Sequence, residues 1–288
     1  MPEHPELPFH FAGIHWRLGT RPLIMGILNV TPDSFSDGGE CAAPDAAVER
    51  GLALAAAGAD LLDVGGESTR PGAAPVAAAE EAARVVPVIR ELARRTAVPI
   101  SIDTVKAPVA EAALAAGAVI LNSVRPLHED PGLLALLRQG AAGAILMHMR
   151  GTPQTMQAQT EYGDVVAEVF RFFENGLAAL AAAGVAPERL VLDPGLGFAK
   201  TATQNLELIR ALGRFRTLGR PLLAGPSRKS FIGHLLDEPD PKRRQWGTAA
   251  AVAACVFHGA DILRVHDVPE MLQVCRVAAA CRPAAGTG

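Results

Sequence analysis

An excess of charge of either sign is missing from this chain: its 288 residues carry 27 Lys and Arg against 30 Asp and Glu, a net charge of -3. No basic segment is long enough to follow a phosphate backbone, so nucleic acid is not expected as a partner. No apolar run approaches the roughly 20 residues that a membrane span needs. Residues 1–8 hold acids and prolines in place of a signal segment, which predicts a cytoplasmic location.

Cysteine is also rare. Cys41, Cys255, Cys275 and Cys281 are too few for a disulfide scaffold and lack the spacing of a zinc site. We expect these residues to be reduced and to serve in packing. Because 49% of the residues are hydrophobic, the chain can bury a sizeable core, and we expect one domain over residues 1–288.

Short β-branched runs alternate regularly with longer alanine-rich segments, which predicts parallel βα units joined by crossovers. The runs predicted to be strands are Leu23–Asn29, Asp60–Val64, Pro99–Asp103, Val119–Asn122, Ala144–Met149, Leu190–Asp193, Pro221–Ala224 and Ile262–Val265. The segments predicted to be helices are Pro44–Ala57, Pro75–Arg95, Lys106–Ala116, Pro131–Gln139, Gly163–Ala183, Gln204–Leu212, Arg243–His258 and Pro269–Cys281. Many of the helices begin near a proline and end at a glycine, the usual start and stop residues.

Eight such units in about 260 residues favour an α/β fold of the closed (β/α)8 type, a TIM barrel. The segment Phe9–Leu18 precedes the first unit, and we expect it to form an N-terminal β-ribbon that closes the barrel bottom. A doubly wound open sheet is the alternative fold. It is disfavoured because no Gly-x-Gly-x-x-Gly turn follows the first strand.

Polar side chains occur at the carboxyl ends of the predicted strands, where a barrel of this type holds its catalytic groups. Asn29, Asp103, Asn122 and Asp193 end the first, third, fourth and sixth strands. Asp and Asn also end strands for purely structural reasons, so a single one is weak evidence. Their recurrence at equivalent places predicts a binding site at this end of the barrel.

The last two strands indicate an anion site. Arg264 and His266 are two residues apart, so they project the same way from an extended strand, and Lys229 follows the turn after the seventh strand. Loops seven and eight of such barrels commonly bind phosphate, and three cations favour this reading over a structural ion pair. Asn29, across the mouth, offers an oxygen that suits Mg²⁺ beside a pyrophosphate.

Asp103, Asn122 and Asp193 form a second group. Together they are able to accept hydrogen bonds from, and donate to, the edge of a planar, nitrogen-rich ring. The structural alternatives are that Asp103 caps the following helix and that Asp193 shapes the turn at Pro194. Capping does not explain why three polar strand ends face one pocket.

Several motifs, taken in order, resemble the dihydropteroate synthase family of folate biosynthesis, whose members are pterin-binding TIM barrels. The motifs are Met25–Gly39, Gly65-Gly66-Glu67-Ser68-Thr69-Arg70-Pro71-Gly72, Ser101-Ile102-Asp103-Thr104, Met147-His148-Met149, Asp193-Pro194-Gly195-Leu196-Gly197-Phe198-Ala199-Lys200-Thr201, Ser227-Arg228-Lys229 and Arg264-Val265-His266-Asp267. The resemblance covers nearly the whole chain. It implies a transferase that condenses 6-hydroxymethyl-7,8-dihydropterin pyrophosphate with 4-aminobenzoate, by dissociative substitution at the pterin methylene, to give 7,8-dihydropteroate and pyrophosphate.

The resemblance also implies roles for single residues. The pterin ligands would be Asp103, Asn122, Met147, Asp193 and Lys229. The pyrophosphate ligands would be Asn29, Arg264 and His266, with Asn29 acting through Mg²⁺ as the cofactor. Loops at Phe35 and Asp37 and at Thr69, Arg70 and Pro71 would close over the site, and Phe198, Lys229 and Ser230 would border the aminobenzoate.

The residues expected to carry the catalysis are Lys229, Asp103, Asp193, Arg264 and His266. Arg264 and His266 would stabilise the leaving pyrophosphate, and the two acids would favour a pterin that becomes cationic at its methylene carbon. The family further implies a homodimer formed through the last two helices.

Two positions depart from the family pattern. Ser123 replaces the Asp that usually follows the fourth-strand Asn, which leaves open the orientation of Asn122 and activity itself. Gln204 replaces a His and is expected to lie at a helix start.

Other functions stay open at this point. A non-catalytic pterin-binding paralogue is suggested by Ser123. A pterin-dependent methyl-transfer domain shares the barrel and the ring-binding pocket but has no need of the anion site at Arg264 and His266. A different phosphate-binding barrel enzyme leaves the loops Asn29–Gly39 and Gly65–Gly72 unexplained.

Overall fold

The structure is a computed structural model that describes residues 6–31, 43–68 and 72–282. Its centre is a sheet of eight parallel strands in the order β8-β7-β6-β5-β4-β3-β10-β9. The strands are β3 (Leu23–Asn29), β4 (Leu61–Gly65), β5 (Ile100–Asp103), β6 (Ile120–Ser123), β7 (Gly143–Met147), β8 (Leu190–Asp193), β9 (Leu223–Ala224) and β10 (Ile262–Val265). Leu192 of β8 bridges Leu222, next to β9, so the two edges of the sheet meet. The predicted TIM barrel is confirmed, and the open doubly wound sheet is wrong.

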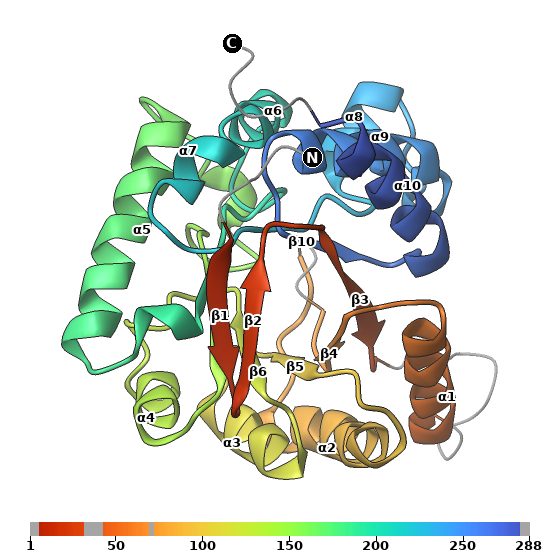
Figure 1. The fold of residues 1–288 in the computed structure, drawn as a ribbon, viewed down its shortest axis with the longest axis vertical. Coiled ribbons are helices and arrows are strands. Elements are labelled where there is room, and N and C mark those ends of the chain that lie inside the picture. Colours follow the sequence, from red (N-terminus) through yellow and green to blue (C-terminus); the bar gives the residue numbers. More distant parts are fainter. Residues whose placement is uncertain (1–5, 32–42, 69–71, 283–288) are drawn as a thin grey trace.

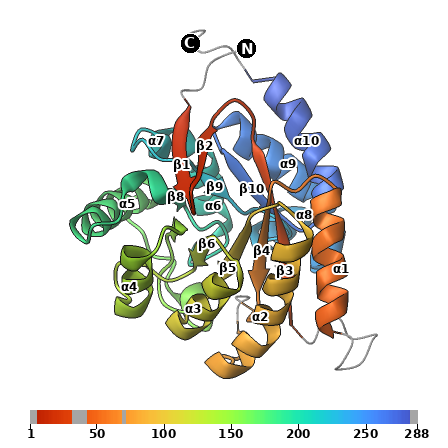
Figure 2. The ribbon, with the colours of Figure 1, turned by 60° about the horizontal axis from the view of Figure 1, so that its bottom comes forward.

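Helices surround the strands on the outside (Figures 1 and 2). In the described ranges they are α1 (Ala43–Ala56), α2 (Ala78–Arg95), α3 (Ala107–Ala116), α4 (Pro131–Gln139), α5 (Val165–Ala182), α6 (Ala202–Arg210), α7 (Leu212–Arg216), α8 (Ser230–Leu236), α9 (Gln245–Phe257) and α10 (Val268–Ala280). Their apolar stripes face the sheet: Val85, Ile89 and Leu92 of α2 are fully buried at helical spacing. β4 is buried along its whole length because helices cover its outer side and the barrel core its inner side.

A two-stranded antiparallel ribbon, β1 (Leu7–Phe11) and β2 (Ile14–Leu18), lies in front of the barrel in Figure 1. Phe9 and Phe11 of the ribbon are buried against side chains at the amino ends of the barrel strands. At Gly143, the first residue of β7, an added Cβ would come within 2.9 Å of the Phe9 ring, so the ribbon packs directly on the strand. The predicted ribbon at the barrel bottom is confirmed.

The helix prediction was wrong in detail after β8. The single predicted helix Gln204–Leu212 is two helices, α6 and α7. α6 begins earlier than predicted because Thr201 and Gln204 form a capping box, in which each side chain bonds the backbone N–H of the other residue. The short helix α8 was not predicted, since about two turns with Gly233 at the centre give too little periodicity to detect.

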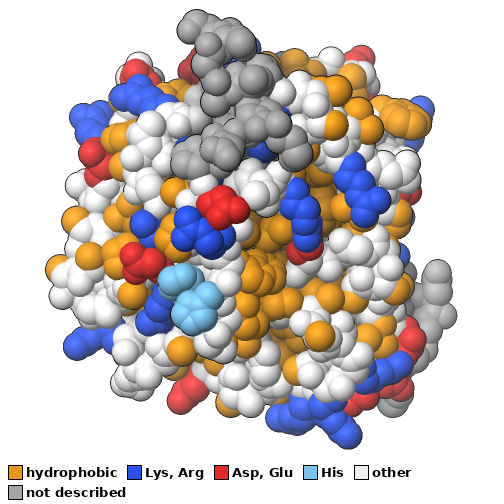
Figure 3. All heavy atoms as spheres, viewed as in Figure 1, with side chains coloured by type: hydrophobic (Ala, Val, Ile, Leu, Met, Phe, Trp, Pro, Cys, Tyr) orange, Lys and Arg blue, Asp and Glu red, His pale blue; other side chains and the backbone are white. Residues whose placement is uncertain are grey.

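On the face seen in Figure 1, acidic and basic side chains stand singly or in small groups among apolar ones (Figure 3). Among the helices of residues 6–31, 43–68 and 72–282, none combines the length and the apolar character needed to cross a bilayer.

Candidate active site

A cavity with about 360 Å³ of open space lies at the carboxyl ends of the barrel strands. Strands β5 to β10, or the loops that follow them, supply the lining: Asp103, Asn122, Val124, Met147, Asp193, Leu196, Phe198, Gly225, Lys229 and Arg264. The fold therefore brings together seven residues singled out from the sequence, namely Asp103, Asn122, Met147, Asp193, Phe198, Lys229 and Arg264.

The other predicted site residues are not part of this lining. In the described part of the chain, Asn29 ends β3 half-buried, His266 follows β10, and Ser230 is the exposed first residue of α8. The predicted loop residues Phe35, Asp37, Thr69, Arg70 and Pro71 lie outside the described residues.

Arg264 lies between two carboxylates at the cavity. Its Nε donates to Asp63 Oδ2 at 2.6 Å, and its Nη2 donates to Asp103 Oδ2 at 2.8 Å. Asn122 Nδ2 also donates to Asp63 Oδ2, at 3.0 Å. His266, predicted to face the same anion as Arg264, has its Nδ1 2.9 Å from the hydroxyl of Ser227. One guanidinium thus connects acids from adjacent strands, β4 and β5.

The two acids of the lining sit in a poorly hydrated place, which disfavours their charged forms. Burial raises the pKa of Asp103 to about 7, while Arg264 acts in the opposite direction. Burial also raises the pKa of Asp193, although its Oδ1 accepts a hydrogen bond from the backbone N–H of Gly195 at 2.8 Å. Both carboxyl groups are therefore poised to gain from hydrogen-bond donors supplied by a ligand.

Lys229 lies above an aromatic ring in the lining of the same cavity. Its Nζ is 3.8 Å from the centroid of Phe198, a cation–π contact. Gly197 allows the approach, because a Cβ at this position would lie 2.8 Å from Lys229 Cδ and because its φ of +83° favours glycine. The loop between β8 and α6 thus sets the place of the Lys229 ammonium.

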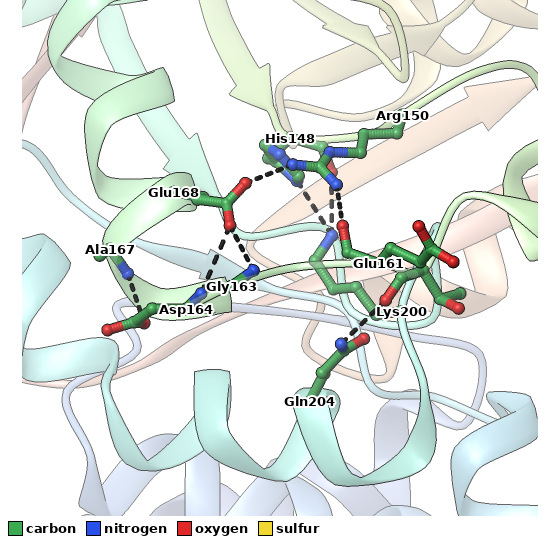
Figure 4. A network of polar contacts seen from close by, with 10 residues as sticks. His148, Arg150, Glu161, Gly163, Asp164, Ala167, Glu168, Lys200 and Gln204 are labelled. Atoms are coloured by element: carbon green, nitrogen blue, oxygen red, sulfur yellow. Dashed lines mark hydrogen bonds and ion pairs between the residues drawn. The ribbon is translucent and has the colours of Figure 1, made fainter.

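The same loop contains a buried lysine, Lys200, whose side chain forms hydrogen bonds with the backbone of the loop (Figure 4). Its Nζ donates to the carbonyl oxygens of Gly195 at 3.1 Å and Phe198 at 2.9 Å, and lies 3.1 Å from His148 Nδ1. Burial lowers the pKa of Lys200 to about 7. Burial and the nearby Lys200 lower the pKa of His148 to about 2, so the neutral imidazole accepts the hydrogen bond.

Further polar contacts fasten the neighbouring loop after β7 (Figure 4). The guanidinium of Arg150 lies 3.8 Å from the ring centroid of Tyr162 and forms an ion pair with Glu168 of α5. Gln204 Nε2 donates to the carbonyl oxygen of Thr160 at 2.9 Å. Gln204 therefore serves the helix start, as predicted from the sequence, and also joins two loops that border the site.

Ser123, the other departure from the family pattern, is fully buried, and its Oγ accepts a hydrogen bond from the backbone N–H of Arg125 at 3.1 Å. Asn122 keeps its place in the cavity lining. Asn122 is oriented by Asp63 instead of by its neighbour in sequence.

Asp63 and Lys200 are charged residues at the site to which we assigned no role from the sequence, and the same holds for the lining residues Val124, Leu196 and Gly225. A detectable signal exists for Asp63, since an acid between Leu62 and Val64 in the middle of an apolar strand is unfavourable without a partner. Lys200 gives a weaker signal. Its partners are mostly backbone carbonyl groups, which leave no trace in the pattern of side chains.

Comparison with known sequences finds a family model described as pterin binding enzyme, which matches residues 25–266. The chain is 50% identical over 274 residues to dihydropteroate synthase of Synechocystis sp., a match that covers 95% of this chain and 94% of the relative. It is 46% identical over 258 residues to dihydropteroate synthase of Escherichia coli (strain K12), covering 90% and 91% of the two chains.

Solved structures give the same picture. Dihydropteroate synthase of Xanthomonas albilineans with 4-aminobenzoic acid superposes with a TM-score of 0.89 at 45% identity, covering 97% of this chain and 100% of the other. The enzyme from the same organism in complex with 7,8-dihydropteroate gives a TM-score of 0.85 at 43% identity, with the same coverage.

Proposed function

The chain belongs to the pterin-binding enzyme family, in its dihydropteroate synthase branch, and we propose that the cavity at the carboxyl end of its barrel is where that reaction takes place. The enzyme is a transferase that acts on small molecules. It condenses 6-hydroxymethyl-7,8-dihydropterin pyrophosphate with 4-aminobenzoate. The observation that carries the proposal is the meeting of acids, an amide and two cations in the lining of one cavity.

Recognition of the pterin follows from the donor and acceptor inventory of the lining. Asp103 and Asp193 accept hydrogen bonds from ring N–H groups, and the amide of Asn122 matches the remaining edge. Met147 packs in an apolar cluster with Val124 and supplies a nonpolar wall for the ring. The raised pKa values of the two acids fall again when the ligand donors arrive, because such hydrogen bonds favour the carboxylate.

In the substitution, the bond between the pterin methylene carbon and the pyrophosphate oxygen breaks, and the electron pair leaves with pyrophosphate. The lone pair of the aminobenzoate nitrogen forms the new C–N bond, and this nitrogen then loses a proton. Asp103 and Asp193 stabilise positive charge that develops on the pterin. Arg264 and His266 stabilise the leaving group, and Lys229 with Phe198 positions the amine against the carbon.

Mg²⁺ is part of the proposal. The described residues include no cluster of three or more His, Cys, Asp or Glu that would hold a metal by itself. Asn29 provides one amide oxygen at the end of β3. Such a donor suits a Mg²⁺ ion bound mainly by pyrophosphate oxygens and water, and the ion would neutralise charge on the leaving group.

The buried free thiols of Cys255 and Cys275 support the proposal that the enzyme works in a reducing compartment, the cytoplasm. The ribbon and the barrel share one apolar cluster, which supports the proposal that residues 1–288 form a single domain. Exposed apolar side chains on the last two helices, Phe257 and Val277, support a homodimer through this surface.

The test is product formation by the purified chain given dihydropterin pyrophosphate, 4-aminobenzoate and Mg²⁺, with release of pyrophosphate and dihydropteroate both measured. We expect Lys229→Ala to lower kcat/KM by about 100-fold or more, because it removes the cation that contacts Phe198. Lys242→Ala is the matched control, since Lys242 is exposed in the short 3-10 helix Pro241–Arg243, outside the cavity lining.

The competing functions predict other results in this assay. Pterin binding without dihydropteroate would identify a non-catalytic pterin binder, and Ser123→Asp would then be the next protein to assay. Equal rates of dihydropteroate formation by the unmodified chain and Lys229→Ala would contradict the catalytic role proposed for Lys229. A methyl-transfer domain would form no dihydropteroate and release no pyrophosphate.

A further inference from the structure

Asp63 is an acid in the middle of the barrel strand β4, and its side chain has no exposed surface. It pairs in register with Ser101 of β5, and its chain neighbours Leu62 and Val64 are fully buried in the core. A charged group at such a place costs free energy unless it is compensated, and buried acids are retained where they have partners or a function.

The partners of Asp63 are two residues of the cavity lining. Its Oδ2 accepts from Arg264 Nε at 2.6 Å and from Asn122 Nδ2 at 3.0 Å, so one oxygen fixes groups from β10 and β6. Asp63 itself is not among the residues that line the cavity. It therefore lies behind the groups that line the cavity.

The charges in this cluster do not balance among the three closest groups. Asp63 and Asp103 share the single guanidinium of Arg264, and Oδ1 of Asp63 has no hydrogen-bond partner among the described residues.

We propose that Asp63 is a positioning residue of the pterin pocket: it orients Arg264 and Asn122 towards the ligand and divides the charge of Arg264 between two acids. The inference rests on the proposed function, because it takes the cavity to be the pterin site. Asp63 does not line the cavity, so it acts through the hydrogen bonds to its two partners and through its charge on neighbouring groups.

The charge of Asp63 also reaches Asp103. Burial raises the pKa of Asp103 to about 7; Arg264 and Lys229 oppose the rise, while Asp63 and Glu81 add to it. Neutralising Asp63 removes a like charge and leaves Arg264 to Asp103 alone. Both changes lower the pKa of Asp103, so its carboxylate persists to lower pH.

The experiment measures binding of 6-hydroxymethylpterin by fluorescence from about pH 5 to about pH 7.5. In the unmodified chain, affinity falls as the pH falls and Asp103 becomes protonated. For Asp63→Asn we expect a Kd raised about tenfold near neutral pH, because the amide keeps an acceptor oxygen but loses the negative charge that holds Arg264 and Asn122 in place. We also expect the fall in affinity at acid pH to begin at a lower pH than in the unmodified chain.

Asp261→Asn is the matched control. Asp261 is also a buried acid, paired with Arg216 and the backbone N–H of Leu222, but it precedes β10 at the other end of the barrel. We expect this variant to unfold at lower temperature and to keep the binding profile of the unmodified chain. If the amide of Asp63→Asn cannot be packed, Asp63→Ser removes the same charge with a smaller side chain.

In a folded Asp63 variant, an unchanged affinity with no shift of the pH at which affinity falls would overturn the inference and leave Asp63 a structural residue. An equal shift of the pH at which affinity falls in Asp261→Asn would also overturn the inference, since loss of any buried acid would then have this effect. Failure of the unmodified chain to form dihydropteroate contradicts the proposed function alone, because the binding profile needs no turnover.

Discussion

Asp193 shows how a single residue at the end of a barrel strand acquires a special environment. It is the last residue of β8, lines the cavity and is almost wholly buried. Its Oδ1 accepts one hydrogen bond, from the backbone N–H of Gly195, and burial raises the pKa of the carboxyl group. A buried carboxylate with few hydrogen-bond donors forms a stronger hydrogen bond with a ligand N–H than an exposed carboxylate does.

Asp193→Asn tests this role. We expect the Kd for 6-hydroxymethylpterin to rise about tenfold or more, because the amide loses the charge that strengthens these hydrogen bonds. The KM for 4-aminobenzoate should change far less. Calorimetric titration with the pterin and steady-state kinetics with the amine supply the two numbers, and a larger effect on the amine would reverse the assigned orientation of the cavity.

At the scale of elements, the loop between β8 and α6 follows Asp193 and contains Phe198, which contacts Lys229. Its Gly195 has a φ of +67° and so little room that a Cβ would lie 2.0 Å from the carbonyl oxygen of His148. The Nζ of Lys200 donates hydrogen bonds to two carbonyl oxygens of this loop, those of Gly195 and Phe198. The buried amine of Lys200 and the side chain of Asn205, whose Oδ1 accepts from the backbone N–H of Gly197 at 2.6 Å, therefore hold a loop that has no regular secondary structure.

The titration of Lys200 gives this element a measurable signature. The pKa of Lys200 in the folded protein is lowered to about 7 from 10.5 by burial, so the unfolded chain binds the proton more tightly. The free energy of unfolding should therefore rise with pH from about pH 7 towards pH 10.

In Lys200→Met, which removes the titrating amine, we expect this rise to be smaller than in the unmodified chain, as measured by urea unfolding at several pH values. The exposed Lys242→Met is the control and should keep the full rise. Parallel curves for Lys200→Met and the unmodified chain would mean that the amine has an ordinary pKa when folded.

For the molecule as a whole, the two ends of the barrel have different tasks. The amino ends of the strands are covered by the apolar side chains of the ribbon of β1 and β2. The carboxyl ends carry the cavity with its acidic, amide and cationic lining residues. Stability and chemistry are thereby separated, which is common in this fold. The remaining apolar surface of note lies on α8, α9 and α10.

A homodimer through the last two helices should depend on that surface. Val277 of α10 is 66% exposed, and Leu235 of α8 is 54% exposed but lies outside the last two helices. We expect Val277→Glu to lower the sedimentation coefficient towards that of a monomer, because a charge would be buried in the interface, and Leu235→Glu to leave it unchanged. A monomer in the unmodified chain would end the dimer proposal.

The sequence alone determined the architecture and much of the cavity lining. The periodicity of strands and helices is a local property, so the eight βα units could be predicted from the sequence. In a barrel, the residues that end the parallel strands lie at one rim. For this reason Asp103, Asn122 and Asp193 were predicted together and do line one cavity. The roles of all the predicted site residues, Asn29, His266 and Ser230 included, stay predictions.

Only the tertiary structure determined the contacts that depend on closure of the barrel and on the course of the loops. Asp63 and Arg264 are 201 positions apart, and β10 must close against β3 before they can form an ion pair across the barrel. Lys200 is held mainly by carbonyl oxygens whose direction follows from loop torsion angles. Local periodicity carries no information on either contact, because both are set by the three-dimensional course of the backbone.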